Sequence, residues 1–123
     1  MAQCKGAIGG KLKAFLIDGV SYDMANADTT IKPILDTREA VDGEGFTVNE
    51  TNTFIEVVLR DKSDLPLKDL FKFCNVEIVA ELQNGKTYAW ADAWYGGEGS
   101  LSAGTGEISC RFESMEDAEE VLV

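Results

Sequence analysis

Hydrophobic and polar residues alternate along most of the chain, which is typical of β-strands that bury one face. The alternation is clearest in Thr53–Asp61, where Ile55, Val57 and Leu59 share one side. The other alternating or β-rich stretches are Lys11–Ile17, Val20–Met24, Thr29–Leu35, Val76–Leu82, Lys86–Tyr95 and Glu107–Glu113. The turn-forming pairs Asp18-Gly19 and Asn84-Gly85 separate successive stretches. The pattern therefore predicts about seven strands, mostly in antiparallel hairpins.

One stretch, Lys86–Tyr95, alternates large side chains with small ones. Tyr88, Trp90, Asp92 and Trp94 are expected on one face. Two tryptophans on one face can stack on a sugar or a base, but they more often pack inside a sandwich or at an interface. A monomeric ligand-binding β-sandwich is therefore kept as a distant alternative.

A single helix is predicted after the strand Thr53–Asp61. Ser63 is a suitable N-cap, Pro66 is tolerated in the first turn, and Lys72 suits the C-terminal end. Apolar residues from Leu65 to Phe73 form a wide stripe that must be buried against a sheet. We expect the core between helix and sheet to contain Leu67, Leu70, Phe71, Ile78 and Phe112.

These elements predict a mainly β fold, an antiparallel β-sandwich or half-open barrel with one α-helix packed at an edge. The length of 123 residues fits one domain, 1–123. Two polar segments extend this core: a long stretch at 36–52 and an acidic tail at 115–123. A loop as long as 36–52 is usually functional or disordered. It is interpreted as an arm that contacts a partner, with a mobile linker as the alternative.

Composition excludes several classes of function. The chain has 22 acidic and 11 basic residues, a net charge of −11, which excludes a basic nucleic-acid-binding surface for the domain as a whole. The absence of histidine removes imidazole bases and histidine metal sites. Three cysteines without a C-x-x-C spacing favour neither a disulfide framework nor a zinc site. We therefore expect no enzymatic activity, no metal and no cofactor.

Neither membrane insertion nor export by a leader is expected. No apolar run approaches the ~20 residues that a spanning helix needs. The N-terminal region has only Ala14–Ile17 as an apolar run after Lys13, shorter than a signal sequence requires. The sequence predicts a protein made in the cytoplasm without processing.

An ordered series of segments carries a family resemblance. IEVVLRD at 55–61 is followed by DLPLKDL at 64–70, VEIVAELQNGKTYAWADAW at 76–94 and GTGEISCRFES at 104–114. Upstream, GKLK at 10–13 and the segment from TRE to DGEGF at 37–46 continue the series. In this order the segments resemble the tail tube proteins of contractile-tailed bacteriophages, of the Mu-like kind. The hairpin LQNGKTYAW is the most specific part.

The resemblance implies a fold shared with the tube protein of type VI secretion. It also implies self-assembly into hexameric rings that stack into a hollow tube inside a contractile sheath, located in the virion tail. The implied partners are further copies of the chain, the tail sheath, the baseplate initiator and the tail terminator. Genomic DNA would pass through the lumen without specific binding. The tube of a phage-tail-like bacteriocin or of a type VI injection device is the alternative.

Two groups of residues are candidates for roles in such a tube. The stacking contacts are expected in the arm, at Arg38, Glu39, Asp42, Gly43, Glu44, Gly45 and Phe46. Acidic residues opposite the core faces of the strands are expected to line the lumen, at Glu56, Glu77, Glu81 and Glu107. Negative charge at the lumen surface would repel DNA and keep it mobile. An outer solvated face is the alternative position for each glutamate.

Overall fold

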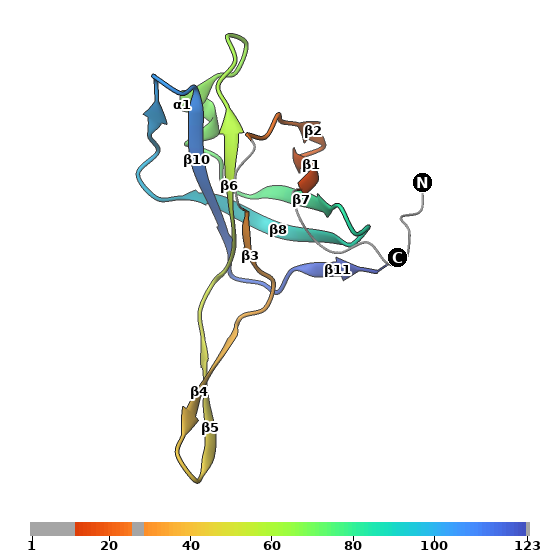
Figure 1. Ribbon diagram of the computed structural model, residues 1–123, viewed down its shortest axis with the longest axis vertical. Helices are drawn as coiled ribbons and strands as arrows, with labels where there is room; N and C mark the ends of the chain where they lie inside the picture. Colours follow the sequence, from red (N-terminus) through yellow and green to blue (C-terminus); the bar gives the residue numbers. More distant parts are fainter. Residues whose placement is uncertain (1–11, 26–28, 123) are drawn as a thin grey trace.

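The computed structural model describes residues 12–25 and 29–122, which form eleven strands and one short helix (Figure 1). The strands are β1 (Leu12–Ile17), β2 (Val20–Ser21), β3 (Thr30–Lys32), β4 (Asp36–Val41), β5 (Gly45–Glu50), β6 (Thr53–Arg60), β7 (Val76–Leu82), β8 (Thr87–Gly96), β9 (Leu101–Ser102), β10 (Glu107–Ser114) and β11 (Glu119–Val121). The helix is α1 (Leu67–Leu70). The predicted mainly β, antiparallel fold with one helix is confirmed.

Nine strands form one continuous sheet that folds into two layers, and β4 and β5 form a separate hairpin. The order along the sheet is β2-β1-β7-β8-β10-β6-β3, with β11 beside β8 and β9 beside β10. The first layer contains β2, β1, β7, β8 and β11, and the second contains β10, β6, β3 and β9. All the pairings are antiparallel, as the two-residue turns predict.

Strand β8 connects the two layers. Its first part, Thr87–Ala93, pairs with β7, whereas Trp94–Gly96 pairs with β10. The register with β7 shifts by one residue between Trp90 and Ala93, and within this shift Asp92 takes a left-handed backbone conformation with φ 50°. This is a β-bulge, in which one extra residue bends the strand and changes the direction of the side chains that follow.

The bulge overturns the predicted alternation in β8. Tyr88 and Trp90 are buried as expected, but Asp92 is exposed and Ala93 is buried. Trp94 pairs with Glu113 and is half-buried, while its neighbour Tyr95 packs against the core. The prediction of one continuous face is wrong after Trp90, because the extra residue exchanges the two faces of the strand.

The core lies between the two layers and is continuous with the helix. The Phe15 ring of β1 contacts the Phe112 ring of β10, with 6.0 Å between centroids. Tyr95 packs edge-on against Phe112 at 5.3 Å and against Phe71 at 5.0 Å. Burying each large apolar side chain contributes about 1.5–3 kcal/mol. Of the five expected core residues, Leu70, Ile78 and Phe112 are buried, and Leu67 and Phe71 are half-buried against them.

The helix is much shorter than predicted. It has one turn, Leu67–Leu70, and its N-cap is Pro66 in an extended conformation rather than Ser63. The residue before a proline is disfavoured in the α conformation, so Leu65 separates Ser63 from the helix. Lys72 lies beyond the C-cap Phe71 and is not part of the helix. A left-handed glycine, Gly99 (φ +66°), passes over Phe71 so closely that a Cβ would lie 2.8 Å from the ring.

Other element boundaries also differ. Strand β2 ends at Ser21, although Met24 still forms a bridge to Leu59. The segment at 115–123, expected to be a tail, contains β11 paired with β8. Cys74 is exposed, whereas Cys110 is buried. Within the described residues, no helix is long and apolar enough to cross a membrane.

The first prediction concerns the buried face of β7. Ile78→Asp should destabilise the protein by more than about 4 kcal/mol or prevent folding, because Ile78 is fully buried and the new carboxylate would have no partner. Urea unfolding followed by circular dichroism measures the effect. The matched control is Val79→Asp, on the half-buried opposite face, which should cost much less. Equal losses for both variants would contradict the register of β7.

The second prediction concerns alkaline pH. Burial raises the pKa of the Cys110 thiol from 9.0 to about 12, and that of the Tyr95 hydroxyl from 10.0 to about 12. Between about pH 9 and 12 the folded protein therefore holds more protons than the unfolded chain, and the free energy of unfolding should fall as the pH rises. Urea unfolding across this range tests the slope. Tyr95→Phe should make the slope shallower, and an unchanged slope would contradict the contribution of Tyr95.

Candidate functional site

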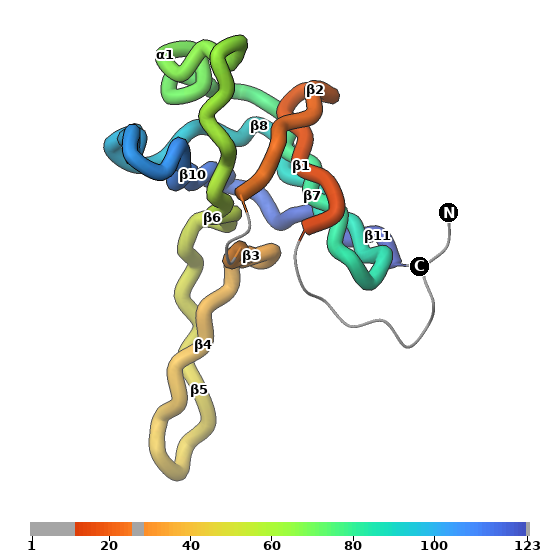
Figure 2. Tube along the Cα trace, turned by 45° about the horizontal axis from the view of Figure 1, so that its top comes forward, coloured from red at the N-terminus to blue at the C-terminus, as the bar shows by residue number. Residues whose placement is uncertain are grey.

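The most distinctive feature of the molecule is the hairpin of β4 and β5, which we call the arm (36–52). It projects from the body along the long axis of the molecule (Figures 1 and 2). Within its two strands every residue except Thr37 is exposed. The sequence predicts a polar loop here, but the structure has a ladder of six paired residues on each strand. The arm therefore has no core of its own within the described chain.

The two faces of the arm differ in chemistry. Arg38 pairs with Val48 and Ala40 pairs with Phe46, so these four side chains share one face. The Arg38 guanidinium carbon lies 4.8 Å from the centre of the Phe46 ring, a cation–π contact. Phe46 is 57% exposed and Val48 is 49% exposed. We call these four residues the apolar patch of the arm; Asp36 and Glu50 lie on the same face nearer the base. Exposed apolar groups gathered in this way mark interaction surfaces.

The opposite face and the tip of the arm are mostly polar. Thr37, Glu39 and Val41 face Thr47 and Asn49 across the hairpin. Asp42, Gly43 and Glu44 form the turn, in which the Glu44 amide donates to the Val41 carbonyl at 3.0 Å. Gly43 (φ +77°) and Gly45 (φ +120°) have backbone conformations that favour glycine. Of the seven expected contact residues, the structure therefore brings Arg38 and Phe46 together, places Glu39 on the other face, and gives Gly43 and Gly45 a backbone role.

The base of the arm is held by Lys32. Its Nζ lies 2.8, 3.2, 2.9 and 3.4 Å from the carbonyl oxygens of Ile34, Leu35, Thr51 and Asn52, respectively. An ammonium group has three donors, so it can hold both chains of the arm at once. The Thr51 amide also donates to the Leu35 carbonyl at 2.9 Å. Lys32 thus joins the two chains where they leave the body.

The C-terminal segment fastens this base to the body. Asp117 accepts a hydrogen bond from the Leu35 amide at 2.8 Å, and the Ala118 amide donates to the Pro33 carbonyl at 2.8 Å. The Thr53 hydroxyl donates to the Glu116 carbonyl at 2.6 Å. Sequence analysis missed both Lys32 and Asp117. Lys32 lies in the β-rich stretch Thr29–Leu35 and Asp117 in the acidic segment at 115–123, and no sequence pattern indicates that these two positions meet.

The four glutamates expected at the lumen lie on two different outer faces. Glu77 and Glu81 are on β7 in the first layer, opposite its buried residues. Glu56 on β6 and Glu107 on β10 belong to the second layer. Glu56 forms an ion pair with Arg111, whose guanidinium lies 4.0 Å from the centre of the Phe54 ring. The structure therefore places two of the glutamates on each outer face, and Glu56 and Glu107 each lie opposite an arginine.

The described residues offer little for catalysis. None of the residues in 12–25 and 29–122 form a group of three or more carboxylates and thiols suited to a metal ion. The pKa of the buried Cys110 thiol is raised to about 12, so it stays protonated at neutral pH. Trp90 is buried in the core, and Trp94 lies beyond the bulge. The two indoles therefore do not form the stacking platform that a ligand-binding sandwich would need.

Comparison with known proteins adds a family match. The family described as phage tail tube protein has a model that matches residues 7–119 of the chain. This range covers nearly all of the elements described above, including the arm and β10. No curated protein matches the chain. The match confirms the resemblance inferred from the segments between 10 and 114.

The third prediction concerns the arm in the isolated molecule. Phe46→Ala should change the free energy of unfolding of the monomer by less than about 1 kcal/mol, because the ring is exposed and its cation–π contact with Arg38 is at the surface. Urea unfolding at a protein concentration that keeps the chain monomeric measures this. Phe112→Ala is the buried counterpart and should cost about 3–5 kcal/mol. A comparable loss for both variants would mean that the Phe46 ring is buried in the monomer.

Proposed function

This chain belongs to the phage tail tube protein family, whose members are non-enzymatic structural components of the tail, and we propose that it assembles into stacked hexameric rings. The stacked rings form the inner tube, the conduit through which DNA leaves the capsid. The observation that carries this proposal is the arm, a paired hairpin that exposes Phe46 and Val48 away from the body. Such a surface is expected to be covered by a second copy.

The edges of the sheet support lateral assembly. The strands at its ends, β2 and β3, have two and three residues, and β11 at the side of β8 has three. Short edges limit uncontrolled aggregation but leave backbone groups that a neighbouring subunit can pair with. Within a closed ring, every such edge acquires a partner. We expect the subunits of a ring to join through these edges.

The outer face of β7 is the better candidate for the lumen wall. It carries Glu77 and Glu81, and β11, which pairs with the other edge of β8, adds Glu119 to the same face. The outer face of the second layer is partly neutralised, because Arg111 pairs with Glu56 and Arg60 lies opposite Glu107. A wall rich in carboxylates repels the DNA backbone and does not retain it. Glu77 and Glu81 are therefore proposed to face the lumen, whereas Glu56 and Glu107 are not.

The proposed partners follow from the same assembly. Besides other copies of itself, the chain is expected to contact the tail sheath on the outside of the tube, the baseplate initiator at one end and the tail terminator at the other. The location is the virion tail, after assembly in the bacterial host cytoplasm. A phage-tail-like bacteriocin or a type VI injection device would use the same subunit geometry, and the neighbouring genes would distinguish these machines.

The fourth prediction is that the purified chain forms rings or hollow tubes, and that the arm is required for stacking. Negative-stain electron microscopy across a series of protein and salt concentrations should show tubes for the parent. Salt screens the repulsion between subunits of charge −11 and should favour assembly. Deletion of 41–48 should leave a folded monomer or a single ring that does not form tubes.

The control for this deletion is Thr47→Ala, on the polar face of the arm, which should form tubes as the parent does. Circular dichroism must show that the deleted chain is folded. Tubes of normal length from the deleted chain would contradict a stacking role for the arm. A parent chain that stays monomeric under all conditions would contradict self-assembly of the isolated protein.

A further inference from the structure

The segment that follows β10, residues 115–121, runs from the end of β10 past the base of the arm to the edge of β8. We call this segment the strap. It leaves β10 after Ser114 and ends in β11, which pairs with β8. Six of its seven residues are exposed, and Ala118 is half-buried. The strap is therefore held on the body mainly by hydrogen bonds.

The arm lies outside the large sheet, so the pairing of that sheet does not set its direction. Within the described chain, β4 and β5 pair only with each other. The arm is joined to the body by two short connections, residues 33–35 and 51–52. The Lys32 ammonium holds these two connections together, but it does so from a flexible four-carbon side chain. Contacts from outside the hairpin are needed to fix the direction of the arm.

The strap supplies two such contacts. The Asp117 carboxylate accepts a hydrogen bond from the Leu35 amide at 2.8 Å, and the Ala118 amide donates to the Pro33 carbonyl at 2.8 Å. The first bond has a charged acceptor, and such bonds are stronger than bonds between neutral groups. A single bond would leave the connection free to turn about it, whereas two bonds at nearby residues oppose that rotation. The strap therefore holds the chain that enters the arm in one direction.

The strap is anchored to the body at both ends. At its start, the buried Thr53 hydroxyl donates to the Glu116 carbonyl at 2.6 Å. At its end, β11 pairs with Thr87–Ala89 of β8, and the Tyr88 hydroxyl donates to the Glu120 carboxylate at 2.6 Å. Strand β11 has only three residues, and all of them are exposed. The end of the strap is therefore its weaker anchor.

Carboxylates of the strap and of the body face the same hollow. This hollow, of about 360 Å³, is lined by Glu116, Asp117 and Glu119 of the strap, by Glu77 of β7 and by Ala89–Ala91 of β8. Within the described chain no basic residue lines it. Like charges repel, and salt screens this repulsion, with a Debye length of about 30 Å at 0.01 M and about 3 Å at 1 M. Low ionic strength should therefore push the strap away from β7.

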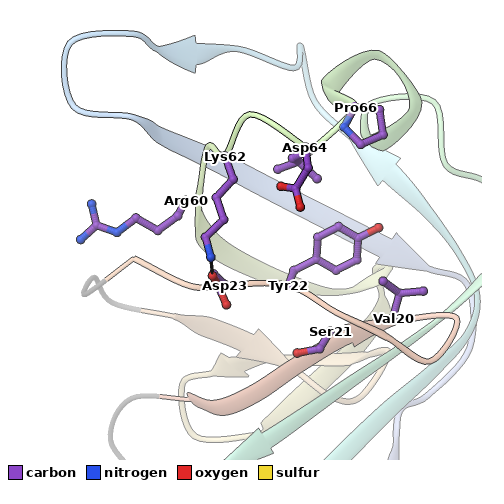
Figure 3. A pocket seen from close by; sticks show the side chains of 9 residues that line it. Val20, Ser21, Tyr22, Asp23, Arg60, Lys62, Asp64 and Pro66 are labelled. Carbon is purple, nitrogen blue, oxygen red and sulfur yellow. Dashed lines mark ion pairs between the residues drawn. The ribbon is translucent and has the colours of Figure 1, made fainter.

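The opposite end of the molecule has balanced charges. A hollow of about 340 Å³ lies where β6 ends, and its walls carry Asp23 and Asp64 as well as Arg60 and Lys62. Lys62 points toward Asp23 and forms an ion pair with it (Figure 3). With two carboxylates and two cations, this end has no net charge to be screened. Salt should therefore act on the strap and have little effect here.

We propose that the strap is a salt-sensitive switch that sets the direction of the arm. When salt screens the charges, the strap lies on the body, and Asp117 and Ala118 hold the arm along the long axis of the molecule. When the charges are not screened, repulsion from Glu77 displaces the strap and frees the Leu35 amide, and the arm turns about its two connections. The switch belongs to a single molecule and goes beyond the proposed function, because it does not require assembly.

The fifth prediction is that the direction of the arm in the monomer depends on salt. Single-molecule fluorescence energy transfer measures it at concentrations too low for assembly. In a Cys4→Ser/Cys74→Ser background, Thr47→Cys and Gln83→Cys carry the dyes on two exposed positions, one on the arm and one in the turn between β7 and β8. This turn lies to one side of the arm (Figures 1 and 2). Cys110 is buried with a raised pKa and should not react.

Lowering the salt concentration from about 1 M to about 0.01 M should shift or broaden the distribution of transfer efficiency in the parent. Asp117→Ala removes the acceptor for the Leu35 amide, so it should show the low-salt distribution even at high salt. Asp117→Asn keeps an acceptor oxygen and should show the parent distribution at high salt.

The role of repulsion is tested separately. Glu77→Gln removes the carboxylate of the body that faces the strap, so the arm should stay held at low salt and the salt-dependent shift should be lost. The matched control is Glu98→Gln, which makes the same change of charge at an exposed position in the loop after β8. This control should keep the salt response of the parent.

Each outcome decides one part of the proposal. A parent distribution that does not change with salt, or an Asp117→Ala distribution equal to that of the parent at every salt concentration, overturns the switch. Equal salt responses of Glu77→Gln and Glu98→Gln overturn repulsion as its cause. Circular dichroism shows whether each variant is folded, and if Asp117→Ala is not, the two glutamate variants decide. None of these results depends on tube formation, which the fourth prediction tests.

Discussion

The bend of β8 at Asp92 is the constraint on which the rest of the structure depends. Ala93, just after the bulge, still pairs with Val76, the first residue of β7, so the bend lies where β8 leaves the first layer for the second. The bulge turns Trp94–Gly96 toward β10. As a result Trp90 and Phe112, on strands of different layers, share one core. The helix also depends on this bend, because Phe71 reaches the core through Tyr95.

Strand β6 turns this sandwich into a molecule with two different ends. Its alternating residues are buried against the core, so its direction is held firmly by the body. Lys32 and Asp117 hold the chains that lead from the body into the arm, and Arg60 ends the strand at the far side of the body. The subunit therefore has an acidic arm at one end and the end of β6 at the other. A subunit of this kind is suited to stacking in one direction.

The alternating segments of the sequence determined most of the sheet. Thr53–Arg60, Val76–Leu82 and Glu107–Ser114 follow the predicted period of two within a residue at each end. The turns at Asp18-Gly19 and Asn84-Gly85 lie at the positions that these residue pairs predicted. In these segments the β-strand preference of the residues agrees with the face that the core buries. The sequence of each segment is therefore enough to predict its strand and its buried face. The absence of histidine and the order of the family segments likewise indicated a structural protein from the sequence alone.

Tertiary structure decided the features that depend on residues distant in sequence. The bulge at Asp92 lies where β8 leaves β7 for β10, and no sequence pattern within β8 indicates that change of partner. The helix stops at one turn because Pro66 and the contact of Phe71 with Tyr95 override the long apolar stripe. Lys32 can hold both chains of the arm only because the hairpin brings the Thr51 carbonyl beside it. The sequence by itself therefore determined the strands, the acidity and the family, whereas packing between distant segments decided which faces are buried and how the arm is held.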